Sequence, residues 1–298
     1  MMVETLRKGV GGTVHRASLL PVRYGIRPDL IGSRLWRMIA MMARWETKPT
    51  IPITASVLER HPGLWQRIRD ADLAVHGYQH ISYVDIPLDE KRADLDAACR
   101  VFSKIGLVAG GFRAPYLRAD QETFDLVRNR GFLFDSSCTQ LALPAGHPLT
   151  NPVKQLVASR YGGDPIAPGP AVHPPLVELP VSLPDDEILI DGLGVRSTTG
   201  LWHVFEAMME MASSTGSHLV LQVHPERFHI CAAALELLIE RAVDAGGWLT
   251  PLSGAAAWVV RSPGGSQRWP DGHSFALSIT GDLDAVSIGD FASRIWRK

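Results

Sequence analysis

Two carboxylates near the end of the chain and a pair of histidines far upstream both follow strand-like runs. The last such run, Phe275 to Thr280, leads into Asp282 and Asp284, and an earlier run leads into His76 and His80. Two imidazoles and a carboxylate are the donors of many catalytic metal sites. If these residues form one site, the two ends of the chain must lie side by side in the fold.

The spacing inside each pair allows both side chains to reach one ion. His76 and His80 are four residues apart, which predicts two imidazoles on one side of a helical turn. Asp282 and Asp284 flank one leucine, and alternate residues of an extended segment face the same side. One aspartate can bind a metal while the other stays available as a base. The alternatives are two unrelated polar histidines and an ordinary turn that begins at Gly281.

Two further polar residues stand at the ends of strand-like runs. Arg113 lies beside Pro115, and a permanent cation on a stiff segment suits a bidentate pair with a carboxylate. His224 follows the run Leu219 to Val223, where an imidazole can donate a proton to a leaving group near neutral pH. The alternatives are an ordinary strand-end arginine at Arg113 and, at His224, a core histidine that bonds to the backbone.

Short apolar runs alternate with helix-like segments, in the rhythm of a parallel sheet or a barrel. The expected strands are Asp72 to Val75, Gly106 to Gly110, Leu176 to Pro180, Leu219 to Val223 and Leu277 to Thr280, and the expected helices are Glu90 to Lys104, Gln121 to Arg130, Leu201 to Ser213 and Ala232 to Ala245. Parallel strands of a barrel end on one rim, where such folds hold their catalytic groups. We therefore expect the polar residues after these strands to gather there.

Two stretches have the composition of irregular loops. Leu143 to Pro175 contains eight prolines and is expected to form a loop that could serve as a flap on the substrate side. Arg261 to Pro270 is rich in small residues and is expected to link the last helix, near Ala255 to Trp258, to one extra strand.

Composition limits the class of protein. The chain has 298 residues, of which 46% are hydrophobic and 20% charged, with a net charge of -1. This length suits one large barrel, and the near-zero charge argues against a nucleic-acid partner. The three cysteines are too few and too scattered for a disulfide framework or a structural zinc site. Neither a secretory signal nor a membrane span is visible, so we expect a cytoplasmic protein.

Together these residues resemble the polysaccharide deacetylase family, family four of the carbohydrate esterases. Its members are metal-dependent amide and ester hydrolases on a distorted (β/α) barrel. The motifs that carry the resemblance are His76 to His80, Arg113 to Tyr116 and Leu221 to Pro225. The segments Gly131 to Ser137, Glu178 to Asp186 and Gly247 to Trp258 also look like parts of that family, so the resemblance covers most of residues 48 to 260.

The order of the motifs departs from the family pattern. Family members usually begin with the strand that bears the aspartates, whereas here it forms residues 275–285, after a linker at 261–274. We therefore predict a single circularly permuted barrel over residues 1–298, with its first strand supplied by the C-terminus beside Thr50 to Thr54. Permutation costs little when the termini already lie close together. Residues 1–47 are expected to form a helical segment that serves as a cap, a dimer surface or part of the barrel.

The resemblance implies a ligand set for the metal. His76, His80 and Asp284 would hold a divalent ion, with zinc as the first choice and cobalt, nickel or iron also suited to such ligands. The family usually has adjacent aspartates, whereas Leu283 separates the pair here, and this departure bears on which aspartate is the base and which is the ligand.

The resemblance also implies catalytic roles. Asp282 would be the general base, oriented by Arg113, and His224 would be the general acid that protonates the departing amine. The backbone N–H of Tyr116 would help the metal to stabilise the tetrahedral oxyanion.

These roles predict a hydrolase that removes an acetyl group from an N-acetylated sugar or glycan precursor. One alternative is a hydrolase of cyclic amides, such as allantoin-like or imide-like compounds. Another is a catalytically silent module that binds a metal or a glycan. An open groove lined by tryptophan or tyrosine would favour sugars, a closed pocket the cyclic amide, and lack of a metal the binding module. Assembly into a homo-oligomer is left open.

Overall fold

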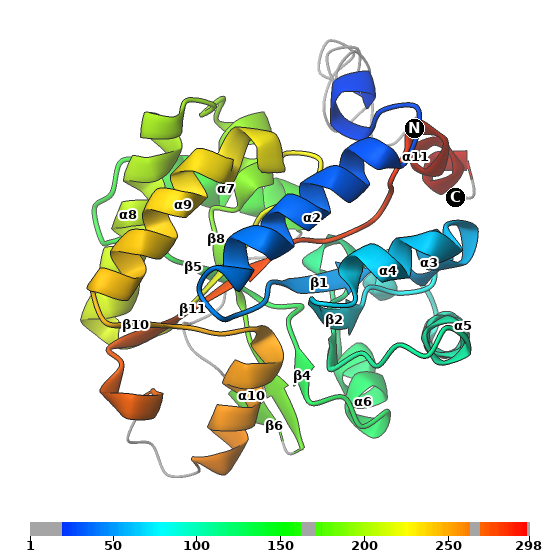
Figure 1. Cartoon of the computed structure of the whole chain (residues 1–298). Helices are drawn as coiled ribbons and strands as arrows, with labels where there is room; N and C mark the ends of the chain where they lie inside the picture. Colours follow the sequence, from blue (N-terminus) through cyan, green and yellow to red (C-terminus); the bar gives the residue numbers. More distant parts are fainter. Residues whose placement is uncertain (1–19, 162–170, 174, 263–268, 297–298) are drawn as a thin grey trace.

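Parallel strands joined by helices form the centre of the structure (Figure 1). This computed structural model describes residues 20–161, 171–173, 175–262 and 269–296. The strands are β1 (Thr50–Ile53), β2 (Asp72–Val75), β3 (Gly111–Phe112), β4 (Phe134–Asp135), β5 (Thr139–Leu141), β6 (Ala171–His173), β7 (Leu176–Glu178), β8 (Val181–Leu183), β9 (His218–Gln222), β10 (Gly247–Leu249) and β11 (Phe275–Thr280).

The pairings join these strands into a ring. β9 pairs with β11, β11 with β1, β1 with β2, β2 with β3 and β3 with β4, all in parallel. β4 with β5, and β7 with β8, each act as one interrupted strand, because β4 pairs with β7 and β5 with β8. β8 pairs in turn with β9 and completes the ring. The fold is therefore the expected α/β type with a distorted parallel barrel, and β6 adds an antiparallel edge beside β7.

Helices connect and cover the strands. They are α2 (Asp29–Ala43), α3 (Ala55–Arg60), α4 (Trp65–Ile68), α5 (Leu88–Lys104), α6 (Gln121–Asn129), α7 (Thr150–Tyr161), α8 (Thr198–Thr215), α9 (Phe228–Asp244), α10 (Leu252–Arg261) and α11 (Ile288–Trp296). Short helical turns are η1 (Pro62–Leu64), η2 (Tyr83–Asp85), η3 (Pro115–Leu117), η4 (Glu187–Gly192) and η5 (Pro270–Gly272). The four helices expected from the sequence correspond to α5, α6, α8 and α9.

The strand closest to the C-terminus lies inside the sheet, between β9 and β1 (Figure 1). Thr280 at the end of β11 is in register with Thr50 of β1 and with Gln222 of β9. Past the end of the strand, Leu283 still bridges to Ile53. The predicted pairing of this strand with the one around Thr50 is therefore confirmed. Its origin in a circular permutation stays a prediction.

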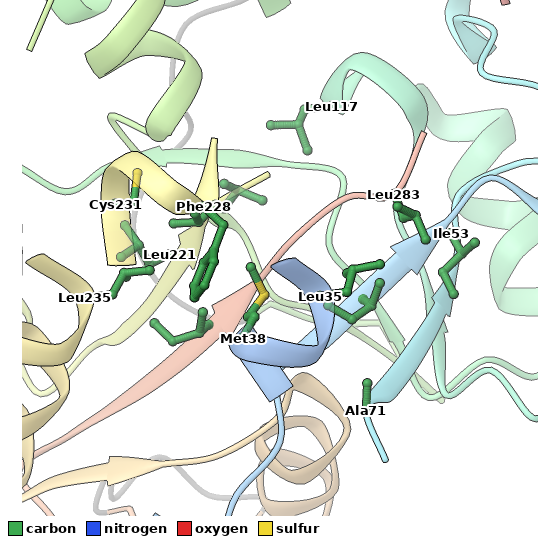
Figure 2. Packing of buried hydrophobic residues seen from close by; sticks show 14 of the residues in the cluster. Leu35, Met38, Ile53, Ala71, Leu117, Leu221, Phe228, Cys231, Leu235 and Leu283 are labelled. Carbon is green, nitrogen blue, oxygen red and sulfur yellow. The ribbon is translucent and has the colours of Figure 1, made fainter. Parts of the chain in front are cut away.

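Helix α2 packs over the sheet where β11 lies between β9 and β1. Leu35 and Met38 are fully buried in the same hydrophobic cluster as Leu221 and Leu283, and Figure 2 shows them together. The Met38 sulfur lies 3.4 Å from where a Cβ on Gly281 would stand, so the helix packs closely over the backbone that leads into the aspartates. Of the predicted helical segment 1–47, residues 1–19 lie outside the described residues.

One expected strand does not form where the apolar run predicted it. The run Gly106 to Gly110 is irregular, and only Gly111–Phe112 pairs as β3. Helix α5 reaches Lys104, and Gly106 then adopts a φ of 72°, which turns the chain. Val108 is 86% exposed, so its apolar side chain belongs to the surface rather than to a strand of the core.

The proline-rich stretch Leu143 to Pro175 is not wholly irregular as expected. It contains the twelve-residue helix α7, in which Pro152 occupies the first turn. Proline is tolerated there because the first N–H groups of a helix have no partner within the helix. Residues 162–170 and 174 lie outside the described residues, so a role of this stretch as a flap stays a prediction.

The predicted linker begins where α10 ends, at Arg261. Residues 263–268 lie outside the described residues. At its far end, the Trp269 indole donates to the Gly216 carbonyl at 2.9 Å, which attaches the start of the last strand to the end of α8.

All three cysteines are free. No helix in the described ranges is long and apolar enough to cross a membrane.

A buried histidine in β9 predicts a pH dependence of stability. Burial lowers the pKa of His218 to about 3, and its Nε2 lies 2.8 Å from Ser278 Oγ. Between the ordinary value of 6.5 and about 3, the unfolded chain binds a proton that the folded chain does not, so stability falls as the pH falls. His218→Leu removes this difference, and Ser278 keeps its bond to the Thr250 carbonyl. Urea unfolding of both proteins at pH 7 and pH 4 should show that the variant avoids a loss of about 3 kcal/mol. Equal losses in the two proteins would contradict this assignment.

Candidate metal centre

The polar residues that follow the strands meet at the carboxyl end of the ring. His76 follows β2, Arg113 follows β3, and His224 lies two residues beyond β9. Asp282 and Asp284 follow β11, which neighbours β9 on one side and β1 on the other. Residues from the first third and the last tenth of the chain thereby share one rim, as the sequence predicted.

Three of these side chains direct ligand atoms toward one point. His76, His80 and Asp284 each offer an atom within 4.8 Å of the others. Asp284 lies between the two imidazoles, with 3.3 Å from its Oδ1 to His76 Nε2 and 3.1 Å from its Oδ2 to His80 Nε2. Both histidines are buried and Asp284 is half-buried. These are the residues that the sequence predicted as metal ligands.

A left-handed glycine, rather than a helical turn, brings the two imidazoles together. Gly77 has a φ of 72°, and the segment between the histidines is not helical, so the helical argument for their spacing was wrong. Their ring centroids are nevertheless 5.1 Å apart. Asp94 of α5 holds the segment, because its carboxylate accepts from the backbone N–H groups of Tyr78 and Gln79 at 2.8 and 2.9 Å.

The donor chemistry of the three residues fits a divalent metal. His76 Nδ1 lies 2.7 Å from the backbone carbonyl of Arg113, so Nδ1 carries a proton and Nε2 is the ring nitrogen that can bind an ion beside Asp284. Such a bond on the second ring nitrogen is typical of histidines that bind metals. Two imidazoles and one carboxylate match the ligands of catalytic zinc sites.

The charges of the two histidines and of the carboxylates shift one another's pKa values. Burial would raise the pKa of Asp284, but His80 and His76 hold it well below its usual value. Burial would lower the pKa of His76, but the carboxylates of Asp282 and Asp284 outweigh it and raise that pKa. The carboxylate therefore stays ionised over the whole neutral range, as a metal ligand must.

The second carboxylate, Asp282, is held by other groups. Its Oδ1 accepts from Arg113 Nη1 at 2.7 Å and its Oδ2 accepts from Gln222 Nε2 at 3.1 Å. Oδ2 also lies 3.7 Å from His76 Nε2, so Asp282 borders the metal ligands. Arg113 binds Asp282 through one nitrogen and not in the expected bidentate manner, because its Nε and Nη2 donate to the carbonyl and hydroxyl of Ser136.

His224 is fixed by a carboxylate that follows the neighbouring strand β8, at the start of η4. Its Nδ1 lies 2.6 Å from Asp186 Oδ1, and its backbone N–H donates to Asp186 Oδ2 at 2.8 Å. Burial would lower the pKa of His224, but Asp186 outweighs it and raises that pKa well above its ordinary value. The imidazole can therefore keep two protons at neutral pH, as a general acid requires.

Tyr116 lies against the metal ligands in a constrained turn. Its ring packs edge-on against the His80 ring with 4.3 Å between centroids. Tyr116 and Leu117 have φ values of 61° and 52°, which is uncommon for bulky residues and recurs at functional sites. The turn η3 thus brings the Tyr116 ring against His80, one of the three candidate ligands.

Sequence reasoning missed two residues that contact the predicted catalytic side chains. Asp186 was named only as the end of the segment Glu178 to Asp186 that resembles the family, although its contact with His224 makes it part of the site. Gln222 was overlooked inside a run taken as apolar. Its position two residues before His224 was the available signal, because alternate residues of a strand face the same side.

The ring of parallel strands, with polar residues from successive strands on its carboxyl rim, is the fold of the polysaccharide deacetylases. A protein from Mycobacterium smegmatis assigned as a polysaccharide deacetylase aligns with a TM-score of 0.62 at 23% identity, over 85% of this chain and 84% of that one. One from Pseudomonas aeruginosa aligns at 0.51 and 20% identity, over 74% of this chain and 72% of that one. The PuuE allantoinase aligns at 0.52 and 19% identity, over 72% of this chain and 68% of that one.

Similarity at the level of sequence is more local. A peptidoglycan deacetylase-like protein of Gibberella zeae is 34% identical over 68 residues, which are 22% of this chain. The match spans only 20% of that protein. No family model matches the sequence. The comparisons therefore establish the fold, in agreement with the resemblance of the motifs.

The geometry of the three ligands predicts the effect of removing one of them. Wild-type protein should bind one zinc ion, and His80→Ala should bind it more weakly by at least the roughly 10- to 100-fold that the loss of an outer-shell partner costs. Calorimetric titration of protein treated with a chelator measures both. The control is His203→Ala, since His203 lies on the surface of α8 with its side chain 69% exposed. Equal affinities of the wild type and His80→Ala would rule out this ligand set.

Proposed function

We propose that the protein is a metal-dependent hydrolase that removes an acetyl group from an N-acetylated sugar or glycan precursor. The observation that carries the proposal is the position of Asp282, which touches Arg113 and borders the cluster of His76, His80 and Asp284. A carboxylate that is held beside a metal site, but is not among its three predicted ligands, suits a base for the attacking water. The fold shared with polysaccharide deacetylases supports cleavage of an amide bond.

His76, His80 and Asp284 would hold the ion, with zinc as our proposal and cobalt, nickel or iron also compatible with the ligands. When bound, such an ion polarises the acyl carbonyl and lowers the pKa of water. The bond from His76 Nδ1 to the Arg113 carbonyl keeps the ring turned toward this position.

Asp282 would accept the proton of the attacking water. The contacts with Arg113 and Gln222 fix the plane of its carboxylate, so little reorientation is needed when the proton arrives. A carboxylate has about four lone-pair sites, and these two hydrogen bonds leave others available. Asp284, between two imidazoles, is the poorer base because its lone pairs would bind the metal.

His224 would protonate the departing amine from Nε2. An amide nitrogen leaves poorly until it gains a proton, and Asp186 on the opposite ring nitrogen favours the doubly protonated imidazole. We further propose that the backbone N–H of Tyr116 stabilises the oxyanion, as the resemblance to the deacetylases implies. The turn η3 supports this role because it brings Tyr116 against His80.

We also propose that the chain is a circularly permuted barrel of this type. The location of β11 between β9 and β1, followed at once by Asp282 and Asp284, supports this reading. Organisation as one domain, a cytoplasmic location, the absence of a nucleic-acid partner and assembly into an oligomer stay predictions.

A second candidate function is the hydrolysis of a cyclic amide. The allantoinase aligns as well as one of the polysaccharide deacetylases, with TM-scores of 0.52 and 0.51. The same metal ligands, base and acid would serve ring opening, because the bond that breaks is again an amide. The two candidates differ in the fate of the amine. Hydrolysis of an N-acetylated sugar separates the amine from the acyl group, whereas ring opening leaves the two joined through the rest of the molecule.

The roles of Asp282 and of the ligands can be separated by one variant. Asp282→Asn keeps a side chain of the same shape, so it should bind zinc like the wild type and lose roughly 10²- to 10⁴-fold in rate. Acetate release from acetylated chitooligosaccharides and ring opening of allantoin are measured in parallel on both zinc-loaded proteins. Acetate release that fails in Asp282→Asn supports the deacetylase, and ring opening alone supports the cyclic amide. Bound zinc without either product would favour the silent binding module.

The contact between Asp186 and His224 predicts a pH dependence of the rate. The raised pKa of His224 means that the acid form persists above the ordinary value of 6.5 and is lost as the pH rises through the raised value. Asp186→Asn removes the charge that raises it, so the alkaline limb of kcat/KM should move to lower pH. At pH 8 the rate should fall by roughly 10²-fold. The pH–rate profiles of the two zinc-loaded proteins test this, and coincident alkaline limbs would exclude His224 as the acid.

A further inference from the structure

We infer that Gln222 is a positioning residue that joins the predicted base Asp282 to the predicted acid His224, and that its amide limits how tightly His224 holds its proton. The catalytic meaning of this inference rests on the proposed function, but the geometry beneath it does not.

Strand register places Gln222 between the two groups. It is the last residue of β9, in register with Thr280 of β11, and two residues before His224. Asp282 stands two residues after Thr280, so His224 and Asp282 each lie two residues beyond the paired residues Gln222 and Thr280 at the ends of neighbouring strands. Gln222 is 2% exposed, so its amide has almost no contact with bulk solvent.

The amide of Gln222 contacts both catalytic side chains through one atom. Its Nε2 lies 3.1 Å from Asp282 Oδ2 and 3.1 Å from His224 Nε2. An amide nitrogen carries two hydrogens, so it can donate to both at once. Its Oε1 lies 3.5 Å from Arg113 Nη1, on the side where a positive charge attracts it.

Two neighbours fix the direction of this amide. Turning it by 180° would place its carbonyl oxygen against the carboxylate of Asp282 and its NH₂ group against the guanidinium of Arg113. Both new contacts would be repulsive, because like partial charges would meet at hydrogen-bond distance. The orientation with NH₂ toward His224 is therefore the one that the charged groups select.

This orientation acts against protonation of His224 Nε2. His224 Nε2 can accept a hydrogen bond from the Gln222 amide only while Nε2 carries no proton. The amide therefore favours the imidazole that is protonated on Nδ1 alone. From the other sides, the charges of Asp186 and Glu226 favour the imidazolium and that of Arg227 opposes it. Asp185, beside Asp186, also interacts with His224. Gln222 is thus a counterweight to these carboxylates.

A group that lowers the pKa of His224 would help it to act as a general acid. A proton held too tightly by the Asp186–His224 pair would not transfer to the amine, since transfer is most effective when the pKa of the acid lies near the working pH. Because the same nitrogen also holds Asp282, one side chain orients the group that takes the first proton and adjusts the group that gives the second.

The test is a titration of His224 itself. In zinc-loaded protein with ¹³C-labelled histidine, the His224 signal is assigned by its loss in His224→Gln and followed against pH by NMR. Gln222→Met, which has similar volume and no donor, should raise the pKa of His224 by about 0.5 to 1 unit, the equivalent of one hydrogen bond. An unchanged pKa would overturn the inference.

Two more variants serve as a control and as a replacement in case Gln222→Met does not fold. Gln140→Met is the matched control, because Gln140 is a buried glutamine of β5 whose amide donates to Ser182 Oγ and the His218 carbonyl. It should leave the His224 titration unchanged, and a similar shift there would mean that loss of any buried amide produces the effect. If Gln222→Met does not fold, Gln222→Asn has an amide too short to reach both partners and should raise the same pKa.

Activity measured on the same samples separates this inference from the proposed function. In an active enzyme, the alkaline limb of kcat/KM should move to higher pH in Gln222→Met, together with a lower kcat. Absence of acetate release by the wild type would count against the proposed function and leave the titration valid. Release by the wild type with identical titrations would overturn the role of Gln222 alone.

Discussion

One buried guanidinium, that of Arg113, connects the parts of the candidate site. It is fully buried, and a charge in that position is tolerated only when its N–H groups are satisfied. Ser136 takes the donors on one side, and Thr280 and Asp282 accept from Nη1 on the other. The backbone carbonyl of the same residue holds the ring of His76. Arg113, which follows β3, therefore bonds through its side chain or its carbonyl to residues at the ends of β2, β4 and β11.

Much of this arrangement follows from local sequence signals. Alternation of apolar runs with helical segments predicts a parallel barrel, and the rule that parallel strands end on one rim brings His76, Arg113 and Asp282 together without any contact being known. The pairing of β11 with β1 also follows, since one metal site must collect both ends of the chain. These predictions hold because they depend on periodicity and topology rather than on the conformation of individual loops.

Other features depend on contacts between distant residues, which local patterns do not specify. Asp186 and Gln222 join the site only through the pairing of β8, β9 and β11. The turn at Gly77 replaces the helical geometry that the spacing of the histidines suggested. Val108 was expected in a strand but lies on the surface, because the identity of an apolar residue does not reveal whether it is buried. In each case the outcome is decided by tertiary packing.

The position of β11 has a consequence for synthesis of the protein on the ribosome. β11 lies between β9 and β1 in the sheet, yet it leaves the ribosome after every other strand of the ring. Until then β9 and β1 have no partner on their facing edges, and unpaired edges can pair with other chains. Both aspartates emerge later still. At about 5–20 residues per second, the roughly 58 residues from Gln222 to Thr280 take about 3–12 s, so the growing chain carries both unpaired edges for that time before the last strand joins them.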